Sequence, residues 1–234
     1  MEIHLRHGHA RVTGADPPSP GPRDITRSGH QVRGIFTSVR FDRAMLWRSR
    51  LGCELMYRLE ASWHISDAHT QTAVMQVDRH DGKSFRYVAH AAAVARDGRL
   101  ICIECAWSQS LRSVNSLARH HAIARHLHAR GVQFRVVTEL QLDAPHVRNT
   151  SRALVQALRN HRAADQDAED LLRLTRSRPS TFGELHSLLG ASGAMRMLAL
   201  GNVYFNTHER LGATTALSYV YQENFDAADF VLAA

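Results

Sequence analysis

The feature that most constrains the fold of this chain is a change in the spacing of its apolar residues. A helical period gives way to strand-like runs that are separated by turns. Residues 43–60 carry leucine, tryptophan and methionine at helical spacing and predict one amphipathic helix. Three β-rich runs follow, at residues 72–77, 85–94 and 99–105. Asp81-Gly82 and Asp97-Gly98 lie between these runs and are strong hairpin-turn signals. We therefore expect a helix followed by a three-stranded meander.

The helical period returns in residues 115–130, and Gly131 is well placed to end that helix with a positive φ. Residues 132–138 form a further run rich in β-branched side chains. A strand joined through a helical crossover to another strand is normally parallel to it. The predicted fold class is therefore α/β, with a mixed sheet flanked by helices.

The last third of the chain has a different pattern of apolar residues. Four helical patterns and then two β-rich pieces occur in it, at residues 150–161, 165–176, 182–189, 192–200, 203–206 and 217–222. Short helices followed by a two-stranded ribbon are the plan of a winged helix, whose second close-packed helix usually enters the DNA major groove. Many small helical modules share this pattern without binding DNA. We expect a small helical, winged-helix-like domain over residues 143–234.

Residues 1–28 are rich in histidine, arginine and proline. The prolines at positions 17, 18, 20 and 22 preclude a regular helix or central strand around them. This segment is expected to be a disordered basic arm.

The net charge of +7 favours a polyanionic partner, and nucleic acid is the commonest one. The alternative is an arginine-rich composition inherited from a GC-rich genome. Lys83 is the only lysine, so the basic side chains are almost all arginine. The three cysteines do not indicate a secreted disulfide scaffold, and no signal peptide or membrane-spanning apolar run is visible. We expect a cytoplasmic bacterial protein with no membrane partner.

Three segments carry a resemblance to a known family. They read GIFTSVRFDRAMLWRSRLGCELMYRLE at residues 34–60, FRYVAHAAAVARDGRLICIECAW at residues 85–107 and GVQFRVVTE at residues 131–139. In order and spacing they resemble TnsA, the endonuclease subunit of cut-and-paste transposons, and the match covers about residues 29–142. The resemblance implies a restriction-endonuclease-like, PD-(D/E)XK fold. It also implies DNA as a partner, together with an integrase-like transposase subunit and an ATPase.

The same resemblance assigns four chemical positions. Metal-dependent cleavage of DNA needs carboxylates around Mg²⁺, which activates water and neutralises charge on the phosphate. The family's helix Glu falls at Gly52, its Asp at His90 and its Lys at Ala106, whereas its strand Glu is kept as Glu104. Arginine substitutes poorly for a catalytic lysine, because it is larger and is effectively never deprotonated. Three of the four positions are therefore lost.

Three functions follow from this pattern. The first is a TnsA-like transposition protein that binds DNA or a partner transposase without cutting DNA and needs no cofactor. The second is an active endonuclease with a rearranged site made of Glu104, His90 and Glu54, since histidine and carboxylates suit Mn²⁺ or Zn²⁺. The cofactor expected of an active enzyme is Mg²⁺ or Mn²⁺. Glu54 lies about 200° around the helix from the position of the family's helix Glu, and this argues against Glu54 as a metal ligand. The third is a regulator that binds DNA through residues 145–234.

Candidate phosphate contacts are arginines near the former cleft and before the predicted recognition helix. They are Arg40, Arg43, Arg48, Arg50, Arg112, Arg119, Arg176 and Arg178. The histidines of the helix at residues 115–130 are expected to be solvated polar positions. Cys102 and Cys105, which are three residues apart on one strand, should face opposite sides of the sheet and remain free thiols rather than bind a metal.

Overall fold

A computed structural model describes residues 2–6, 9–13, 32–70, 74–79, 81–160 and 164–222. Within these ranges the chain divides into two compact units. The first unit contains the described residues up to 56 and residues 65–143, and the second contains residues 57–64 and those from 144 onward. No helix in these ranges combines the length and apolarity that crossing a membrane requires.

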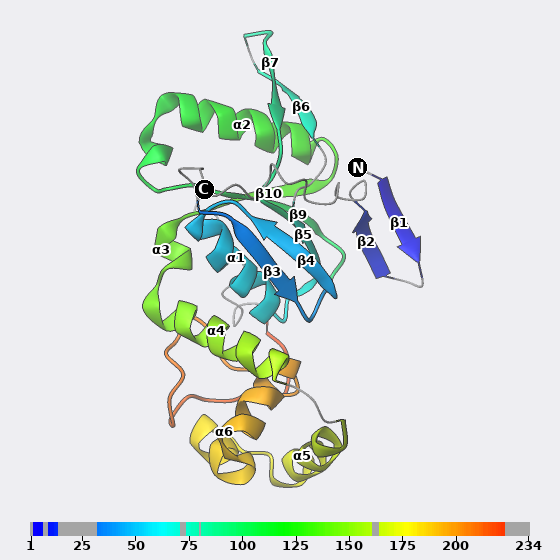
Figure 1. The fold of residues 1–234 in the computed structure, drawn as a ribbon, viewed down its shortest axis with the longest axis vertical. Helices are drawn as coiled ribbons and strands as arrows, with labels where there is room; N and C mark the ends of the chain where they lie inside the picture. The colour runs from blue at the N-terminus through cyan, green and yellow to red at the C-terminus, as the bar shows by residue number, and fades with distance from the viewer. Residues whose placement is uncertain are drawn as a thin grey trace. The chain divides into compact units, whose positions relative to one another are not determined.

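The first unit is built on a four-stranded mixed sheet (Figure 1). Its strands are β5 (Ile65–Thr70), β8 (Ala91–Ala95), β9 (Leu100–Cys105) and β10 (Val132–Val137), in the order β10-β9-β8-β5. β8 is antiparallel to both of its neighbours, whereas β9 and β10 are parallel. The start of α1 (Arg50–Ala61) and α2 (Val114–His128) lie on opposite sides of the sheet. The predicted mixed α/β sheet with flanking helices is confirmed.

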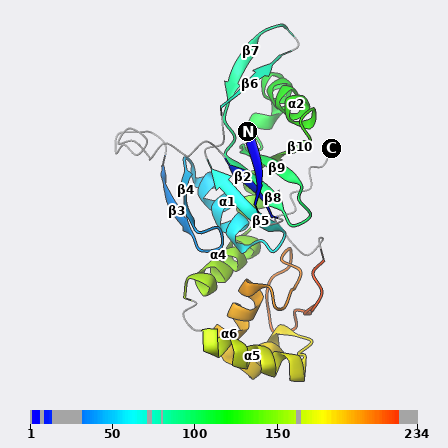
Figure 2. The same cartoon turned by 90° about the vertical axis from the view of Figure 1, so that its right-hand side faces the viewer.

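Small and apolar side chains place β8 and β9 at the centre of this sheet. All five residues of β8 are alanine or valine and are buried, as is typical of strands covered on both faces. Beneath α2, Ile123 and Leu127 pack in one core cluster with Phe134 of β10. The cluster also includes Val77 and Tyr87 from the hairpin of β6 (Met75–Asp78) and β7 (Ser84–Tyr87), which projects beside α2 (Figures 1 and 2).

The turn and crossover predictions are confirmed. Gly98 has φ of 86° in the turn between β8 and β9, and Gly82 has φ of 75° in the turn between β6 and β7. Gly131 follows α2 with φ of 70° and leads directly into β10. A positive φ costs glycine little, and this is why the sequence locates these turns.

The prediction of a helix over residues 43–60 is wrong in its first half. α1 begins at Arg50, and residues 43–47 form β4 (Arg43–Trp47), which pairs in antiparallel fashion with β3 (Gly34–Ser38). Gly34 is paired with Trp47, and a Cβ on Gly34 would lie 2.4 Å from the Trp47 ring. The hairpin therefore depends on a residue that the apolar spacing of residues 43–60 does not include.

The predicted strands at residues 72–77 and 85–94 also need correction. The second of them is divided between β7 and β8, which belong to different sheets, and Val88, Ala89 and His90 lie between them. The first overlaps β6, and its residues 72 and 73 lie outside the described residues. The sheet instead takes its edge strand from β5, whose sequence ISDAHT has little of the apolar alternation that marks a strand.

The amino-terminal residues differ from the expected arm without regular structure. β1 (Glu2–Arg6) and β2 (His9–Thr13) form an antiparallel hairpin. Their sequences, EIHLR and HARVT, alternate apolar and polar residues. The proline-rich part of the expected arm lies outside the described residues.

Two short helices close the first unit, η1 (Ser110–Arg112) and α3 (Glu139–Leu142). The second unit contains α4 (Pro145–Arg159), α5 (Ala164–Ser177) and α6 (Phe182–Leu200). Gly190 interrupts α6 with φ of 71° and ψ of 173°, between the two helices predicted at residues 182–189 and 192–200. The expected ribbon at residues 203–206 and 217–222 is reduced to an isolated bridge between Tyr204 and Ser218.

Trp63 lies at the centre of the second unit. It is fully buried, and its Nε1–H donates to the Leu198 carbonyl over 2.8 Å. Tyr204 and Phe205 pack edge-on against its ring, with centroid distances of 5.3 and 5.5 Å. Residues 57–64 therefore belong to the second unit, although the sequence gives no sign that a segment so far from residue 144 would do so.

Candidate functional site

Glu104, where the resemblance to TnsA keeps the family's residue, has one oxygen paired with an arginine and the other facing a histidine ring. It lies on β9 with 10% of its side chain exposed. Arg119 Nη1 of α2 donates to Oε1 over 3.3 Å. His90 Nδ1, from the segment before β8, lies 3.5 Å from Oε2. The sheet thus brings together two residues that are 14 positions apart and that the resemblance assigns to one site.

His90 is placed by the backbone of β9 as well as by Glu104. The Cys105 N–H is 3.3 Å from His90 Nδ1 and donates to it when the ring is neutral. When Nδ1 carries a proton, it donates instead to Glu104 Oε2, which has no other hydrogen-bond partner among the described residues. Nε2 carries a proton and can donate when the neutral ring accepts through Nδ1 or when both nitrogens are protonated, whereas in the neutral tautomer with the proton on Nδ1 it can only accept.

Arg119 is held by two aromatic rings as well as by Glu104. Its guanidinium carbon lies 5.5 Å from the centroid of Phe85 and 5.4 Å from that of Tyr87. These cation–π distances are favourable. Sequence reasoning proposed Arg119 as a phosphate contact and missed its pairing with Glu104. The only signal for that pairing is the absence of a lysine near Glu104, which leaves the buried carboxylate to find another cation.

The protonation state of Glu104 follows from its contacts with Arg119 and His90. Burial alone would raise the pKa of Glu104, but the neighbouring His90 and Arg119 outweigh it and hold that pKa below its ordinary value. Burial raises the pKa of Cys102 to about 12, and the Tyr87 hydroxyl lies 3.8 Å from its sulfur. Glu104 is therefore an anion at neutral pH, and Cys102 is an inert buried thiol.

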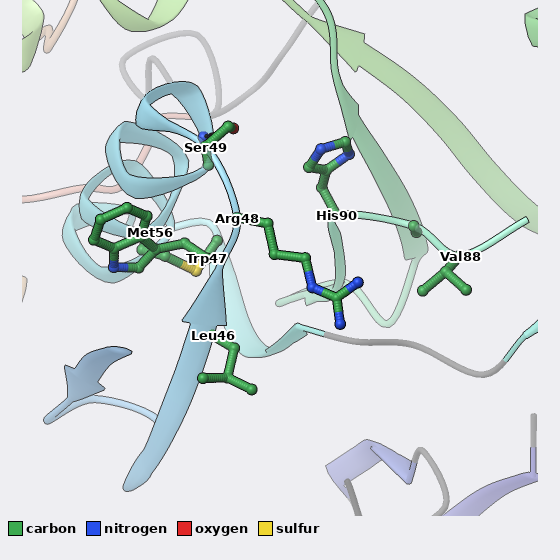
Figure 3. A pocket seen from close by; sticks show the side chains of 9 residues that line it. Leu46, Trp47, Arg48, Ser49, Met56, Val88 and His90 are labelled. Atoms are coloured by element: carbon green, nitrogen blue, oxygen red, sulfur yellow. Dashed lines mark hydrogen bonds between the residues drawn. The ribbon is translucent and has the colours of Figure 1, made fainter. Parts of the chain in front are cut away.

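A cavity of about 260 Å³ lies beside His90 (Figure 3). The end of β4, the first turns of α1 and the segment before β8 form its walls. Gly52 and His90, which the resemblance to TnsA aligns with two chemical positions of that family, both line it. In Figure 3 the Arg48 side chain extends from the end of β4 toward the segment that carries Val88 and His90. Ser49 lines the cavity as well, and its Oγ accepts from the Gly52 N–H over 3.0 Å at the start of α1.

The donor set does not fit the Mg²⁺ that the resemblance implies. Hard cations take oxygen ligands, but Gly52 and Ala106 have no side-chain oxygen and His90 offers only nitrogen. Oε1 of Glu104 is already paired with Arg119, and Oε2 faces His90. Glu54 is buried on α1 but is not among the residues that line the cavity.

The first unit holds six of the eight candidate arginines, and only Arg48 among them lines the cavity. Arg43 is directed inward, with its Nη2 3.1 Å from Asp67 Oδ1 and its Nη1 close to His69. Arg50 at the start of α1 is bidentate to Asp143, with distances of 3.1 and 2.5 Å. Arg40 lies half-buried in the turn before β4, and Arg112 is exposed at the end of η1.

The other two candidates belong to the second unit. Arg176 is exposed in the last turn of α5. Arg178 has φ of 43°, and its guanidinium lies 5.0 Å from the centroid of Tyr219.

The histidines of α2 were expected to be exposed to solvent, and this prediction is wrong for His120. It is 8% exposed and packs against Phe134, whereas His121 and His128 are exposed. Burial lowers the pKa of His120, so the ring is neutral at physiological pH. Cys102 is buried and Cys105 half-buried, and neither forms a disulfide.

Comparison with known proteins adds no family to this geometry: no protein-family model matches the chain, and no curated protein matches it.

Proposed function

We propose that this chain is a TnsA-like DNA-transposition protein that binds DNA and a partner transposase without cutting DNA. The proposal takes the first unit as a restriction-endonuclease-like core. The element order around the four-stranded sheet supports this, because a helix, three strands, a helix and a last parallel strand follow one another (α1, β5, β8, β9, α2, β10), with the hairpin of β6 and β7 inserted between β5 and β8. An integrase-like transposase and an ATPase are the proposed partners.

One observation carries the proposal. Glu104 and His90 meet beside a cavity that Gly52 also lines, which is where the resemblance places a metal site. Oε1 of Glu104 is paired with Arg119, and Oε2 faces His90 Nδ1. A carboxylate that is already paired with a guanidinium has less tendency to bind a metal cation, since two positive charges close to the same group repel each other.

A nicking assay tests the loss of cleavage. Supercoiled plasmid incubated with the protein and Mg²⁺ or Mn²⁺ should stay supercoiled. Glu104→Ala should behave like the wild type, since neither protein cuts. Protein-dependent nicking that Glu104→Ala abolishes would reject the proposal in favour of an active endonuclease with a rearranged site.

A binding assay tests the DNA partner. The affinity for a duplex should fall steeply between 50 and 200 mM salt, because arginine–phosphate contacts release counterions. A flat salt response would indicate a partner that is a protein only.

The same assay addresses the regulator that binds through the second unit. Replacing both Arg176 and Arg178 with glutamine should then remove most of the affinity, whereas the present proposal expects a partial loss. Point substitutions are preferable to deletion here, because residues 57–64 belong to the second unit and would remain in any truncated chain.

A further inference from the structure

A second cavity, called the α4 cavity from here on, lies within the second unit and has a volume of about 490 Å³. Its walls come from the first turns of α4, from α6 and from the segment of residues 208–212. The lining residues are Pro145, His146, Asn149, Thr150, Ala153, Met195, Arg210 and Leu211. Pockets that bind small molecules have volumes of about 300–1,000 Å³. The α4 cavity is therefore large enough for a small organic ligand.

One arginine sets the charge of the α4 cavity. Among the described residues that line it, Arg210 is the permanently charged one, and none is an aspartate or a glutamate. Arg210 is exposed, and its guanidinium has no hydrogen bond or ion pair within the part of the chain that the structure describes. The adjacent Glu209 lies outside the lining and accepts from Asn206 Nδ2 over 2.8 Å. The cavity should therefore attract an anion.

The segment that carries Arg210 is held in place on both sides. At the start of α4, His146 Nε2 donates to the His208 carbonyl over 2.8 Å. The buried Thr215 hydroxyl donates to the Arg210 carbonyl over 3.3 Å and accepts from the Gly212 N–H over 2.9 Å. The backbone of Arg210 is thus ordered before any ligand binds, and this lowers the entropic cost of binding.

The rest of the wall is largely apolar and runs along α4. Pro145 and Ala153 are eight residues apart on this helix, so their side of the cavity is about 12 Å long. Met195 of α6 also lines the cavity. α4 begins without a side-chain cap and without an acidic residue in its first turn, which adds to the preference for an anion at that end. A positive group beside an apolar wall of this length suits an anionic group on a short hydrocarbon chain.

We propose that the α4 cavity binds a small amphipathic carboxylate, with its carboxylate on Arg210 and its hydrocarbon chain along Ala153 and Met195. A guanidinium presents parallel N–H groups that match the two oxygens of a carboxylate. The inference goes beyond the proposed function, because it gives the second unit a ligand that is neither DNA nor a partner protein.

Octanoate is the probe for the first test, in an amide NMR titration of the full chain. The dissociation constant should be roughly 0.1–1 mM, and the shifted amides should lie at residues 145–153, at Met195 and at residues 208–212. Arg210→Gln should weaken binding about tenfold. Arg173→Gln removes the same charge from an exposed pair on α5, outside the lining, and should leave the affinity unchanged. Equal affinities for these two variants, or shifts confined to other residues, would overturn the inference.

Two related compounds test the chemistry of the ligand. 1-Octanol has the same chain without the charge and should bind about tenfold more weakly than octanoate. Acetate has the charge without the chain and should shift no amide at the concentration that saturates with octanoate. If 1-octanol binds as well as octanoate, the cavity selects apolar molecules only. If acetate binds as well, the cavity selects anions only, and either result contradicts the proposal.

A third test fills the apolar part of the cavity. Ala153→Leu should lower the affinity for octanoate by at least about tenfold, since the new side chain occupies the place of the hydrocarbon chain. Gln156→Leu places a leucine at an exposed position of the same helix outside the lining and should have no effect. Leucine is nearly as good a helix former as alanine, so both variants should fold, and thermal melts check this.

A protein segment is the competing occupant of the α4 cavity. Binding of an acidic helical peptide that shifts the same amides, with no response to octanoate, would make the cavity a docking surface for a protein and would reject the small-molecule ligand. None of these measurements contains DNA, so their outcome is independent of the proposed function.

Discussion

At the scale of single residues, a distinctive feature of the described part of the chain is a buried carboxylate, Glu104, that is paired with Arg119 and faces His90. The proposed kinship with TnsA would place its metal-binding and catalytic partners at Gly52, His90 and Ala106, none of which carries a carboxylate or an amine. Arg119 reaches Glu104 from α2 and supplies the charge that pairs with it. A buried charge without a partner costs several kcal/mol, so the pairing has a structural reason that does not require catalysis.

The pairing of Glu104 makes stability depend on pH. Because the folded-state pKa of Glu104 lies below its ordinary value, its contribution is complete above the unfolded pKa and is lost as pH falls through the folded pKa. Glu104→Gln should lower stability by roughly 2 kcal/mol at pH 7, and the difference from the wild type should vanish well below pH 4.5. Urea denaturation at several pH values measures it.

The control for this prediction is Glu169→Gln. Glu169 forms an exposed pair with Arg173 and should contribute nothing measurable at any of these pH values. A constant difference between wild type and Glu104→Gln down to pH 3 would show that packing, rather than charge, holds Glu104 in place.

A second prediction at this scale concerns metal binding. Gly52→Glu combined with His90→Asp places two further carboxylates near Glu104 and should provide the oxygen ligand set that the proposed kinship with TnsA implies. Millimolar Mn²⁺ should then raise the melting temperature by about 2–4 °C, since a ligand that binds only the folded state stabilises it. The wild type should show no such rise.

Its matched control is Gly52→Gln combined with His90→Asn, which has similar shapes and no added charge. If Mn²⁺ has the same effect on both double variants, the assignment of Gly52 and His90 to a former metal site is wrong.

At the scale of elements, the interruption of α6 at Gly190 should be sensitive to a single substitution. Gly190 has φ of 71° and ψ of 173°, a region that is essentially closed to other residues. Gly190→Ala should therefore destabilise the second unit by about 1–3 kcal/mol, although a Cβ there would meet no neighbouring atom. Thermal unfolding followed by circular dichroism measures the change.

Gly212→Ala serves as the comparison. Position 212 also has open space around it but does not have a positive φ, so the added methyl group should cost little. Equal melting temperatures for the two variants would mean that α6 tolerates a continuous helix at position 190.

At the scale of the whole molecule, the chain crosses between its two units more than once. Residues 57–64 belong to the second unit, and Trp63 is fully buried there against residues beyond position 197. A chain that ends at Asp143 should therefore fail to show a cooperative thermal transition. In the full-length protein, Trp63→Ala should cost about 3–5 kcal/mol.

Trp107→Ala provides the contrast, because Trp107 is 48% exposed and should contribute far less. A sharp, reversible transition in the truncated chain would show that the first unit needs none of the contacts of Trp63.

The local elements of the first unit were accessible from the sequence, because short-range rules govern them. Asp81-Gly82 and Asp97-Gly98 mark their turns through the conformational freedom of glycine. The helical spacing of α2 and the β-branched run of β10 predict a parallel crossover. The split at Gly190 was predicted in the same way, from two separate helical patterns.

The elements that the sequence did not predict depend on partners distant in the chain. The apolar residues of β4 fit a helical spacing equally well, and pairing with β3 decided between strand and helix. β5 carries little apolar alternation and becomes a strand because the edge of β8 offers hydrogen bonds.

The sequence by itself determined that residues 52, 90 and 106 carry no carboxylate that could accompany Glu104, since their identities can be read directly. Only the tertiary structure decided what surrounds Glu104: α2 presents Arg119 to it, and a cavity lined by Arg48 and His90 lies nearby. Charges and cavities of this kind arise from side chains that meet across a sheet, and the distance between such side chains is set by packing, which residue spacing along the chain does not encode.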